Sequence, residues 1–451
     1  MIKRKYGVAL MPLIAAFTNT VSADTIQEAI KHTLNTHPEV SASMNSRFSA
    51  EHDLSAAKGA YLPSVTLNAG TGREETDSNS TRSSGNHKVE LTRSESSVNL
   101  NQMVFDGFAT SSEVARQRAT VNSRAYNVLN TSETTALDAV QVYLAVLQRR
   151  EFVRLAEENL ASHERIYDQI RLRSEQGVGR LADMEQAEAR LAQARNNVLT
   201  EKTNLDDAIT NYLSVVGKEP DNLVLPDSAT LSMPASLEEA RRIMLTNSPV
   251  LKSAQSDVEA TEKQYEASKS TFYPRVTVEL ARSMDNNIDG SRGHNSEWQA
   301  MLRMRYNLYE GGAGKANMES KAYQIKEAQD IRNNSLRMLD EELRLAWSAL
   351  NNSRQQLPIA AEYADRSMKV RTAYQKQFSL GERTLLDLLD SENELFTAQR
   401  RLVEVRFTSL FTEYRIKSRM GDLLNSLSIP APAAGKSLTN VTTRAELPSL
   451  N

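Results

Sequence analysis

The residue types that most often carry chemistry are sparse in this chain of 451 residues. It has no cysteine, which excludes disulfides, thiolate metal sites, cysteine catalysis and an acylated cysteine anchor. The histidines show no spacing typical of a metal site, at His32, His37, His52, His87, His163 and His294. We expect His163, which falls in a predicted long helix, to lie on the surface. No nucleophile stands beside an oriented base, so we predict no enzyme, no cofactor and no metal.

Acidic side chains follow two glycine-containing segments. Asp183 comes after Gly177-Val178-Gly179, and Asp387 and Asp390 come after Leu380-Gly381. Glycine accepts the positive φ that a tight reversal requires, so both segments are predicted to be turns. Acidic residues are favoured in the first turn of any helix, where the helix dipole is positive. From the residues alone, that ordinary role is favoured over a functional one.

The segments that position these turns have the period of long α-helices. From Gly107 to Gly217 there is no proline, and two neighbouring stripes of apolar residues recur three and four positions apart. The helix predicted over 107–173 would be roughly 100 Å long at a rise of ~1.5 Å per residue. Leu181–Val216 is predicted to return beside it. Two stripes rather than one indicate a helix with neighbours on both flanks.

The chain then repeats this arrangement. Thr25 and Glu28, which form a predicted capping box, recur as Ser236 and Glu239. We therefore predict five parts along the chain: a signal peptide (1–23), a first repeat (24–217), a linker (218–235), a second repeat (236–421) and a flexible C-terminal tail (422–451). Each repeat is predicted to hold short helices, a β-hairpin and a long helical hairpin.

The two β-hairpins alternate apolar with polar residues. In the first repeat this holds from Val65 to Ala69 and from Val98 to Val104, with Gly72 to Lys88 as the loop. In the second it is clearest from Trp298 to Leu308. Such alternation is usual in a soluble sheet that covers a core. Here no other segment could cover the sheet, and aromatic residues stand near the strand ends, so we favour lipid on one face and a wet lumen on the other.

The N-terminus predicts export. Lys3 to Lys5 are basic, Val8 to Phe17 is a short apolar run, and Val21-Ser22-Ala23 offers a cleavage site. No later segment has eighteen consecutive apolar residues. Charge is nearly balanced, with 54 Lys and Arg against 57 Asp and Glu, so no nucleic-acid partner is indicated.

Four strands per chain predict self-association. Four strands cannot close a barrel, and open strand edges are not tolerated in hydrocarbon. Barrels of about eight strands are filled by side chains, so a conduit favours three or more copies. Arg303 and Arg305 would then face the lumen, where we assign them solvation only.

The sequence resembles the TolC family of outer-membrane efflux and secretion channels over essentially the mature chain. The duplication carries the match, together with the Phe105-Asp106-Gly107 and Tyr309-Glu310-Gly311-Gly312 junctions and the turns at 177–183 and 380–390. The segment Ala57-Lys58-Gly59-Ala60-Tyr61-Leu62-Pro63 and the missing lipidation cysteine resemble the type I secretion branch. Within it the chain is most similar to LapE-like adhesin exporters.

That resemblance implies a mainly α fold with β, in which a homotrimer shares a twelve-stranded outer-membrane barrel continuous with a long α-helical barrel. It implies a periplasmic adaptor, an inner-membrane ABC transporter that supplies the energy, and a secreted protein as cargo. A multidrug efflux channel is the alternative, and a periplasmic adaptor or a soluble coiled-coil scaffold is less favoured.

The resemblance also assigns site residues. It implies an aperture gated by Asp183, Arg383, Asp387 and Asp390. It implies adaptor docking at Val178, Gly179, Leu380 and Gly381. Phe378 departs from the family pattern, because a tyrosine hydroxyl is expected at that position.

Overall fold

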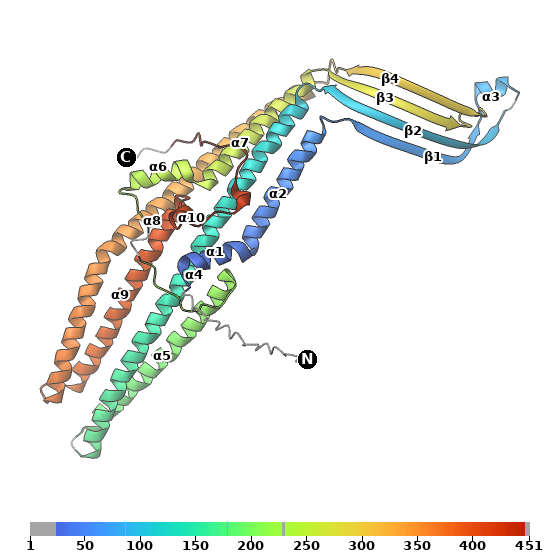
Figure 1. The fold of residues 1–451 in the computed structure, drawn as a ribbon. Helices are drawn as coiled ribbons and strands as arrows, with labels where there is room; N and C mark the ends of the chain where they lie inside the picture. Colours follow the sequence, from blue (N-terminus) through green and yellow to red (C-terminus); the bar gives the residue numbers. More distant parts are fainter. Residues whose placement is uncertain (1–23, 86, 178, 228–230, 447–451) are drawn as a thin grey trace, which may run out of the picture.

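The computed structural model describes residues 24–85, 87–177, 179–227 and 231–446. A four-stranded sheet stands at one end of a long helical body, and two helical hairpins end in tips at the other (Figure 1). The predicted signal peptide and Val178 lie outside the described residues. Within the described ranges, no helix combines the length and the apolar character needed to cross a membrane.

The two halves of the chain show the same order of elements, as the duplication predicts. The first contains α1 (Ile26–Thr36), α2 (Pro38–Gly59), β1 (Ser64–Thr76), α3 (Asn79–Ser83), β2 (Val89–Phe105), α4 (Ala109–Glu175) and α5 (Leu181–Val216). The second contains α6 (Leu237–Asn247), α7 (Pro249–Ser268), the 3-10 turn η2 (Lys269–Phe272), β3 (Arg275–Asn286), β4 (His294–Arg305), α8 (Ala313–Ser379) and α9 (Leu385–Arg419). α4 and α8 both have 67 residues, and at ~1.5 Å per residue each is roughly 100 Å long.

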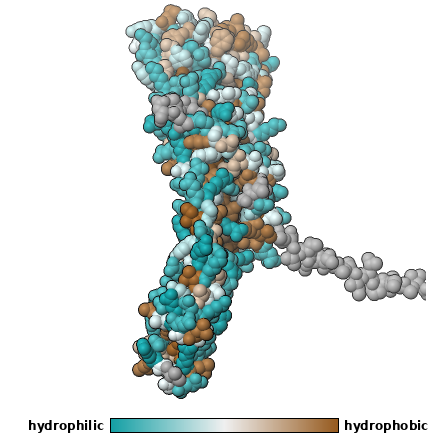
Figure 2. Space-filling model, turned by 90° about the vertical axis from the view of Figure 1, so that its left-hand side faces the viewer, coloured by the Kyte–Doolittle hydropathy of each residue, from teal (hydrophilic) through white to brown (hydrophobic). Residues whose placement is uncertain are grey.

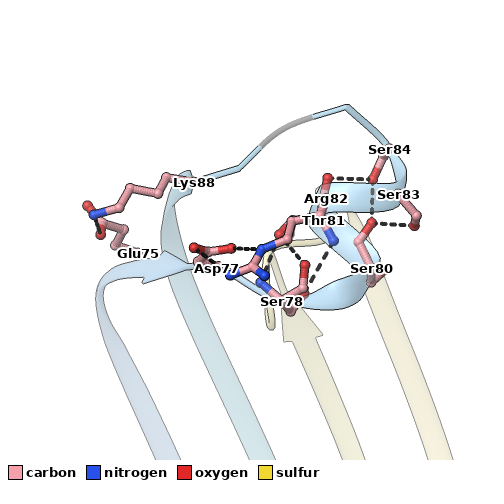
Figure 3. Close-up of polar contacts among 9 residues, drawn as sticks. All are labelled: Glu75, Asp77, Ser78, Ser80, Thr81, Arg82, Ser83, Ser84 and Lys88. Carbon is pink, nitrogen blue, oxygen red and sulfur yellow. Dashed lines mark hydrogen bonds and ion pairs between the residues drawn. The ribbon is translucent and has the colours of Figure 1, made fainter.

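The first hairpin loop differs from its prediction. β1 continues to Thr76, past the expected strand end at Gly72, and the connection contains the short helix α3. The Ser78 hydroxyl accepts the N–H of Thr81, and both Arg82 nitrogens that face Asp77 lie within 3.1 Å of its carboxylate (Figure 3). These local polar contacts stabilise a short helix in the loop, and a hydropathy pattern does not predict them.

The four strands form one antiparallel sheet in the order β1-β2-β3-β4. Val65, Leu100, Leu280 and Ala300 share one row across it, whereas the adjacent row is Thr66, Asn99, Ala281 and Gln299. Side chains in one row point to the same face and successive rows alternate. The sheet therefore has one apolar and one polar face, as the alternation predicts. On the polar face, Arg303 lies 2.9 Å from Glu279.

Helix α4 is buried on more than one flank. It contacts α5 and α2 of its own repeat and α7 and α9 of the other. Val140, Tyr143 and Val146 have no exposed surface. The Tyr143 hydroxyl lies 2.7 Å from the carbonyl oxygens of Asp24 and Val224, which fastens the start of the first repeat and the linker that follows it to α4.

The C-terminal segment is packed, so the predicted flexible tail is wrong for residues 422–446. α10 (Leu423–Ser426) and the turn η3 (Ala433–Gly435) contact α4, and Val441 is buried. The Asn122 amide oxygen accepts the N–H of Leu438 at 2.8 Å, and its nitrogen donates to the Thr439 hydroxyl at 2.7 Å. An extended segment low in hydrophobic residues is thus held mainly through its backbone, which composition does not reveal.

Glu133 of α4 fastens the start of this segment. Its two carboxyl oxygens accept the N–H groups of Leu423 and Leu424 at 3.0 and 3.2 Å. The side chain is buried, and desolvation raises the pKa of Glu133 to about 8 despite those two donors.

We predict that this carboxyl makes stability depend on pH. Its pKa is higher in the folded chain than the ordinary 4.5, so folding favours the protonated form. Stability should therefore fall between about pH 4.5 and 8 and level off above that, and Glu133→Gln should flatten this part of the profile. Thermal unfolding of both proteins in detergent over this pH range measures the difference; parallel profiles would contradict the assignment.

Candidate functional site

The tip between α4 and α5 is a tight reversal built on two glycines. Gly177 has a φ of 73°, and a Cβ on Gly179 would lie 2.9 Å from the backbone nitrogen of Ser174. Both glycines are thus required by the turn. Asp183 is half-buried in the first turn of α5, and its N–H donates to the carbonyl of Arg180 at 3.1 Å. Among the described residues its carboxylate has no ion-pair partner.

The tip between α8 and α9 has a glycine reversal followed by a capping box. Gly381 has a φ of 80°, and Leu380 beside it is 73% exposed. The Thr384 hydroxyl lies 2.8 Å from the Asp387 carboxylate and accepts the Asp387 N–H at 3.2 Å. Asp387 therefore has the ordinary helix-starting role that acidic residues favour at this position.

Arg383 contacts its own hairpin. It donates to Gln377 at 3.0 Å, stacks 4.4 Å from the Tyr374 ring centroid and lies 3.9 Å from Asp387. Within one chain, among the described residues, it forms no link to α4 or α5. The predicted site residues are therefore gathered at two tips, but Asp183 and Arg383 are not brought together.

Asp390 does join the two hairpins. Its carboxylate lies 3.2 Å from a guanidinium nitrogen of Arg190 on α5. Arg190 is not among the residues predicted from the sequence; it lies on the helix face that also carries Asp183, two turns along α5. Helical periodicity could have indicated that face, but not a partner 200 positions away in the sequence.

A second link lies between Arg371 of α8 and Ser162 of α4. Arg371 donates to the Ser162 hydroxyl at 3.0 Å and lies 2.7 Å from the carboxylate of Glu392 on α9. Glu392 is buried, and desolvation raises its pKa even though Arg371 opposes that shift. This contact joins three helices from both repeats.

A third link lies farther from the tips. Glu201 of α5 is buried and pairs with Arg400 of α9 at 2.7 Å and with Arg149 of α4 at 3.5 Å. The Arg400 guanidinium also stacks 4.8 Å from the Phe152 ring centroid. Ion pairs and aromatic packing thus hold α4, α5 and α9 together at this point along the helical body.

An apolar cluster fills the space between the two tips. Its buried members are Ile166, Ile170, Ala187, Phe378, Leu385, Leu388 and Leu389. Phe378 lies under the guanidinium of Arg173, 5.0 Å from its ring centroid. Phe378, which stands where the family pattern has a tyrosine, therefore packs its ring against the first hairpin.

His163 is buried, so the expected surface position is wrong. α4 packs on several sides here, and burial together with nearby Arg190 lowers the pKa of His163. Its Nδ1 has no hydrogen-bond partner within the described part of the chain. No group of three potential metal-ligating side chains occurs among the described residues.

The sequence matches the protein family described as "Outer membrane efflux protein" over residues 29–217 and 241–421. It is 26% identical to the outer membrane efflux protein BepC of Brucella suis biovar 1, over 82% of this chain and 79% of BepC. It is 25% identical to the proteases secretion protein PrtF of Dickeya chrysanthemi, over 93% of each chain. The solved structure of CusC superposes with a TM-score of 0.78 at 13% identity, covering 88% of this chain and 92% of that one.

We predict that Arg400→Ala destabilises the folded chain by roughly 3 kcal/mol, the lower end of the range for breaking a buried pair, since Glu201 keeps the more distant Arg149. The midpoint of thermal unfolding in detergent measures this loss. Arg401→Ala is the matched control, because Arg401 is more exposed and its two side-chain contacts, with Glu404 of its own helix at 3.5 Å and with Gln356 of α8 at 2.9 Å, lie at the surface. Equal midpoints for the two variants would show that the link contributes little.

Proposed function

The chain belongs to the outer membrane efflux protein family, and from this premise we propose that it is the outer-membrane channel subunit of a tripartite type I secretion system. The channel carries protein, such as a large adhesin, across the periplasm and the outer membrane. The observation that carries the proposal is a sheet with one apolar and one polar face at the end of two helical hairpins, whose longer helices are each roughly 100 Å long.

The sheet supports assembly as a homotrimer. β1 and β4 form its two edges, and each edge has unpaired backbone groups that lipid cannot satisfy. Pairing β4 of one copy with β1 of the next removes the edges. Three copies supply twelve strands, which leaves a lumen lined by the polar face.

The helices support a continuous α-helical barrel. Ile331, Met338, Leu345 and Ile359 of α8 are each more than half exposed and stand at multiples of seven positions. That interval is typical of a seam which packs against another helix. On the face shown in Figure 2, hydrophobic patches alternate with hydrophilic surface along the helical body. In the assembly, the α8 seam packs against a neighbouring subunit.

The tips support docking to a periplasmic adaptor. Leu380 and Gly381 on one tip, with Gly179 on the other, lie at the end of the helical body opposite the sheet, and Val178, outside the described residues, completes the proposed docking set. The exposed Leu380 side chain offers an apolar contact to a partner helix. The inner-membrane ABC transporter of the same system supplies the energy.

The contacts between the hairpins support a gate. In the resting channel the apolar cluster, Arg190–Asp390 and Arg371–Ser162 hold the second hairpin against the first. Opening separates them by a helix shift, for which the exposed Arg190–Asp390 pair offers little resistance. Asp387 and Asp390, repeated by threefold symmetry, form an acidic ring that attracts cations.

Two relatives indicate the kinds of cargo to distinguish. PrtF is named for protease secretion, which favours a protein cargo for this chain as well. BepC is named as an efflux protein, and multidrug efflux is the second candidate function.

We expect deletion of the gene to abolish surface display of a large adhesin while drug susceptibility stays within the wild-type range. Quantitative surface labelling of the adhesin and growth inhibition by a panel of drugs measure the two phenotypes. Complementation with the intact gene restores display. Loss of drug resistance with normal adhesin display would instead establish the efflux function.

We predict that replacing Asp387 and Asp390 together by asparagine weakens block of the channel by multivalent cations in planar bilayers. Asparagine at 387 keeps a side-chain acceptor for the helix start, so the change removes charge with little effect on the turn. The double change Glu185→Gln with Glu188→Gln, at exposed positions near the other tip, is the matched control. Unchanged block in the Asp387/Asp390 variant would remove these residues from the gate.

A further inference from the structure

An arginine stands among the apolar side chains on one face of the sheet. Arg282 of β3 pairs in register with Val98 on β2 and Trp298 on β4, and Leu67 completes the row. Because residues in one row share a face, Arg282 projects on the same side as these apolar side chains. It is exposed, and Trp298 beside it is 75% exposed.

The position of this row marks a boundary of the apolar surface. Toward the helices, the same face continues through Leu280, Val278 and Val276 on β3. Away from the helices, the next two rows are mainly polar. They are Ala69, Ser96, Met284 and Ser296, followed by Thr71, Ser94, Asn286 and His294. From Val276 to Arg282 the strand rises roughly 20 Å at ~3.4 Å per residue, comparable with the ~25 Å apolar band of an outer-membrane barrel.

The opposite boundary is marked by aromatic residues. Phe105, Phe108 and Tyr273 pack edge to face with ring centroids 5.4 to 6.5 Å apart, where the strands meet the helices. Aromatic side chains favour the interface between lipid and water. Arg282 and Trp298 therefore stand at the outer interface, farthest from the periplasmic helices.

The Arg282 guanidinium has no hydrogen bond or ion pair to any residue that the structure describes. β3 lies inside the sheet between β2 and β4, so assembly with other copies leaves its immediate neighbours unchanged. The row and the two rows beyond it carry no carboxylate. The nearest charges farther along this face are already paired, as Arg73 with Glu90 at 3.3 Å and Glu75 with Lys88 at 2.7 Å (Figure 3).

An open apolar groove of about 670 Å³ adjoins the guanidinium. Its lining includes Leu67, Val98, Leu280, Met284 and Trp298 together with Arg282. A cation at the water-facing rim of an apolar groove complements a ligand that has a phosphate on acyl chains, since the guanidinium binds phosphate and the groove binds the chains.

We propose that Arg282 and this groove bind an acylated lipid with a phosphorylated head group from the outer leaflet of the outer membrane. The proposal rests on the proposed function, because it needs the apolar face to meet lipid. Arg282 contacts the head-group phosphate, Trp298 lies at the level of the head groups, and the acyl chains lie along Leu67, Val98 and Leu280.

Native mass spectrometry of the detergent-purified assembly, with added diphosphoryl lipid A, tests this site. We expect the wild type to retain the lipid, and Arg282→Gln to weaken binding about fivefold per subunit, the usual contribution of one cation near an anionic lipid surface. Arg282→Lys should keep most of the affinity. Arg305→Gln is the matched control, because Arg305 lies on the polar face of β4.

Several outcomes would overturn the proposal. The first is that diphosphoryl lipid A binds equally well to the wild type and to Arg282→Gln. The second is that the wild type binds dephosphorylated lipid A as well as the diphosphoryl form. The third is that inorganic phosphate displaces the lipid, which would indicate an ion site. The same spectra report the number of subunits. A trimer without lipid binding would refute only this site, whereas a monomer would refute the proposed function as well.

Discussion

Burial of α4 on several flanks is the constraint on which the other contacts depend. α5 and α2 pack against it from the first repeat, α7 and α9 from the second, and α10 and η3 from the C-terminal segment. A helix this long gains little from its own hydrogen bonds alone, so the packed neighbours provide most of its stability. Because both repeats share α4, the two helical hairpins are held as one body rather than as two tandem domains.

Along this body the links between hairpins change in kind. Near the tips, Asp390 of the Arg190 pair is 60% exposed, and such pairs contribute little in water. Farther up, Glu201 is almost fully buried between Arg149 and Arg400, where losing one partner is costly. In the proposed gate, separation of the tips therefore breaks the weak exposed pair and opens the apolar cluster between them, while the upper part of the hairpins stays packed.

Periodicity predicted the largest features because they depend on local pattern. α4 begins and ends two residues from its predicted limits, and α5 was placed correctly, since each is bounded by glycines. Alternation predicted the two faces of the sheet. Features that depend on partners distant in sequence escaped: Arg190 beside Asp390, the burial of His163, and the C-terminal segment, whose backbone is held by Asn122. Helix α3 was missed because its bonds are local and polar.

The packing of residues 432–446 against α4 joins parts of the chain that lie far apart in sequence. These residues bond to the side chain of Asn122 on α4, more than three hundred positions earlier, so the whole second repeat must be made before these contacts can form. Until they form, the Asn122 amide has only water to bond. Contacts that close loops of this length form late in folding, so the C-terminal segment completes the packing around α4 rather than starting it.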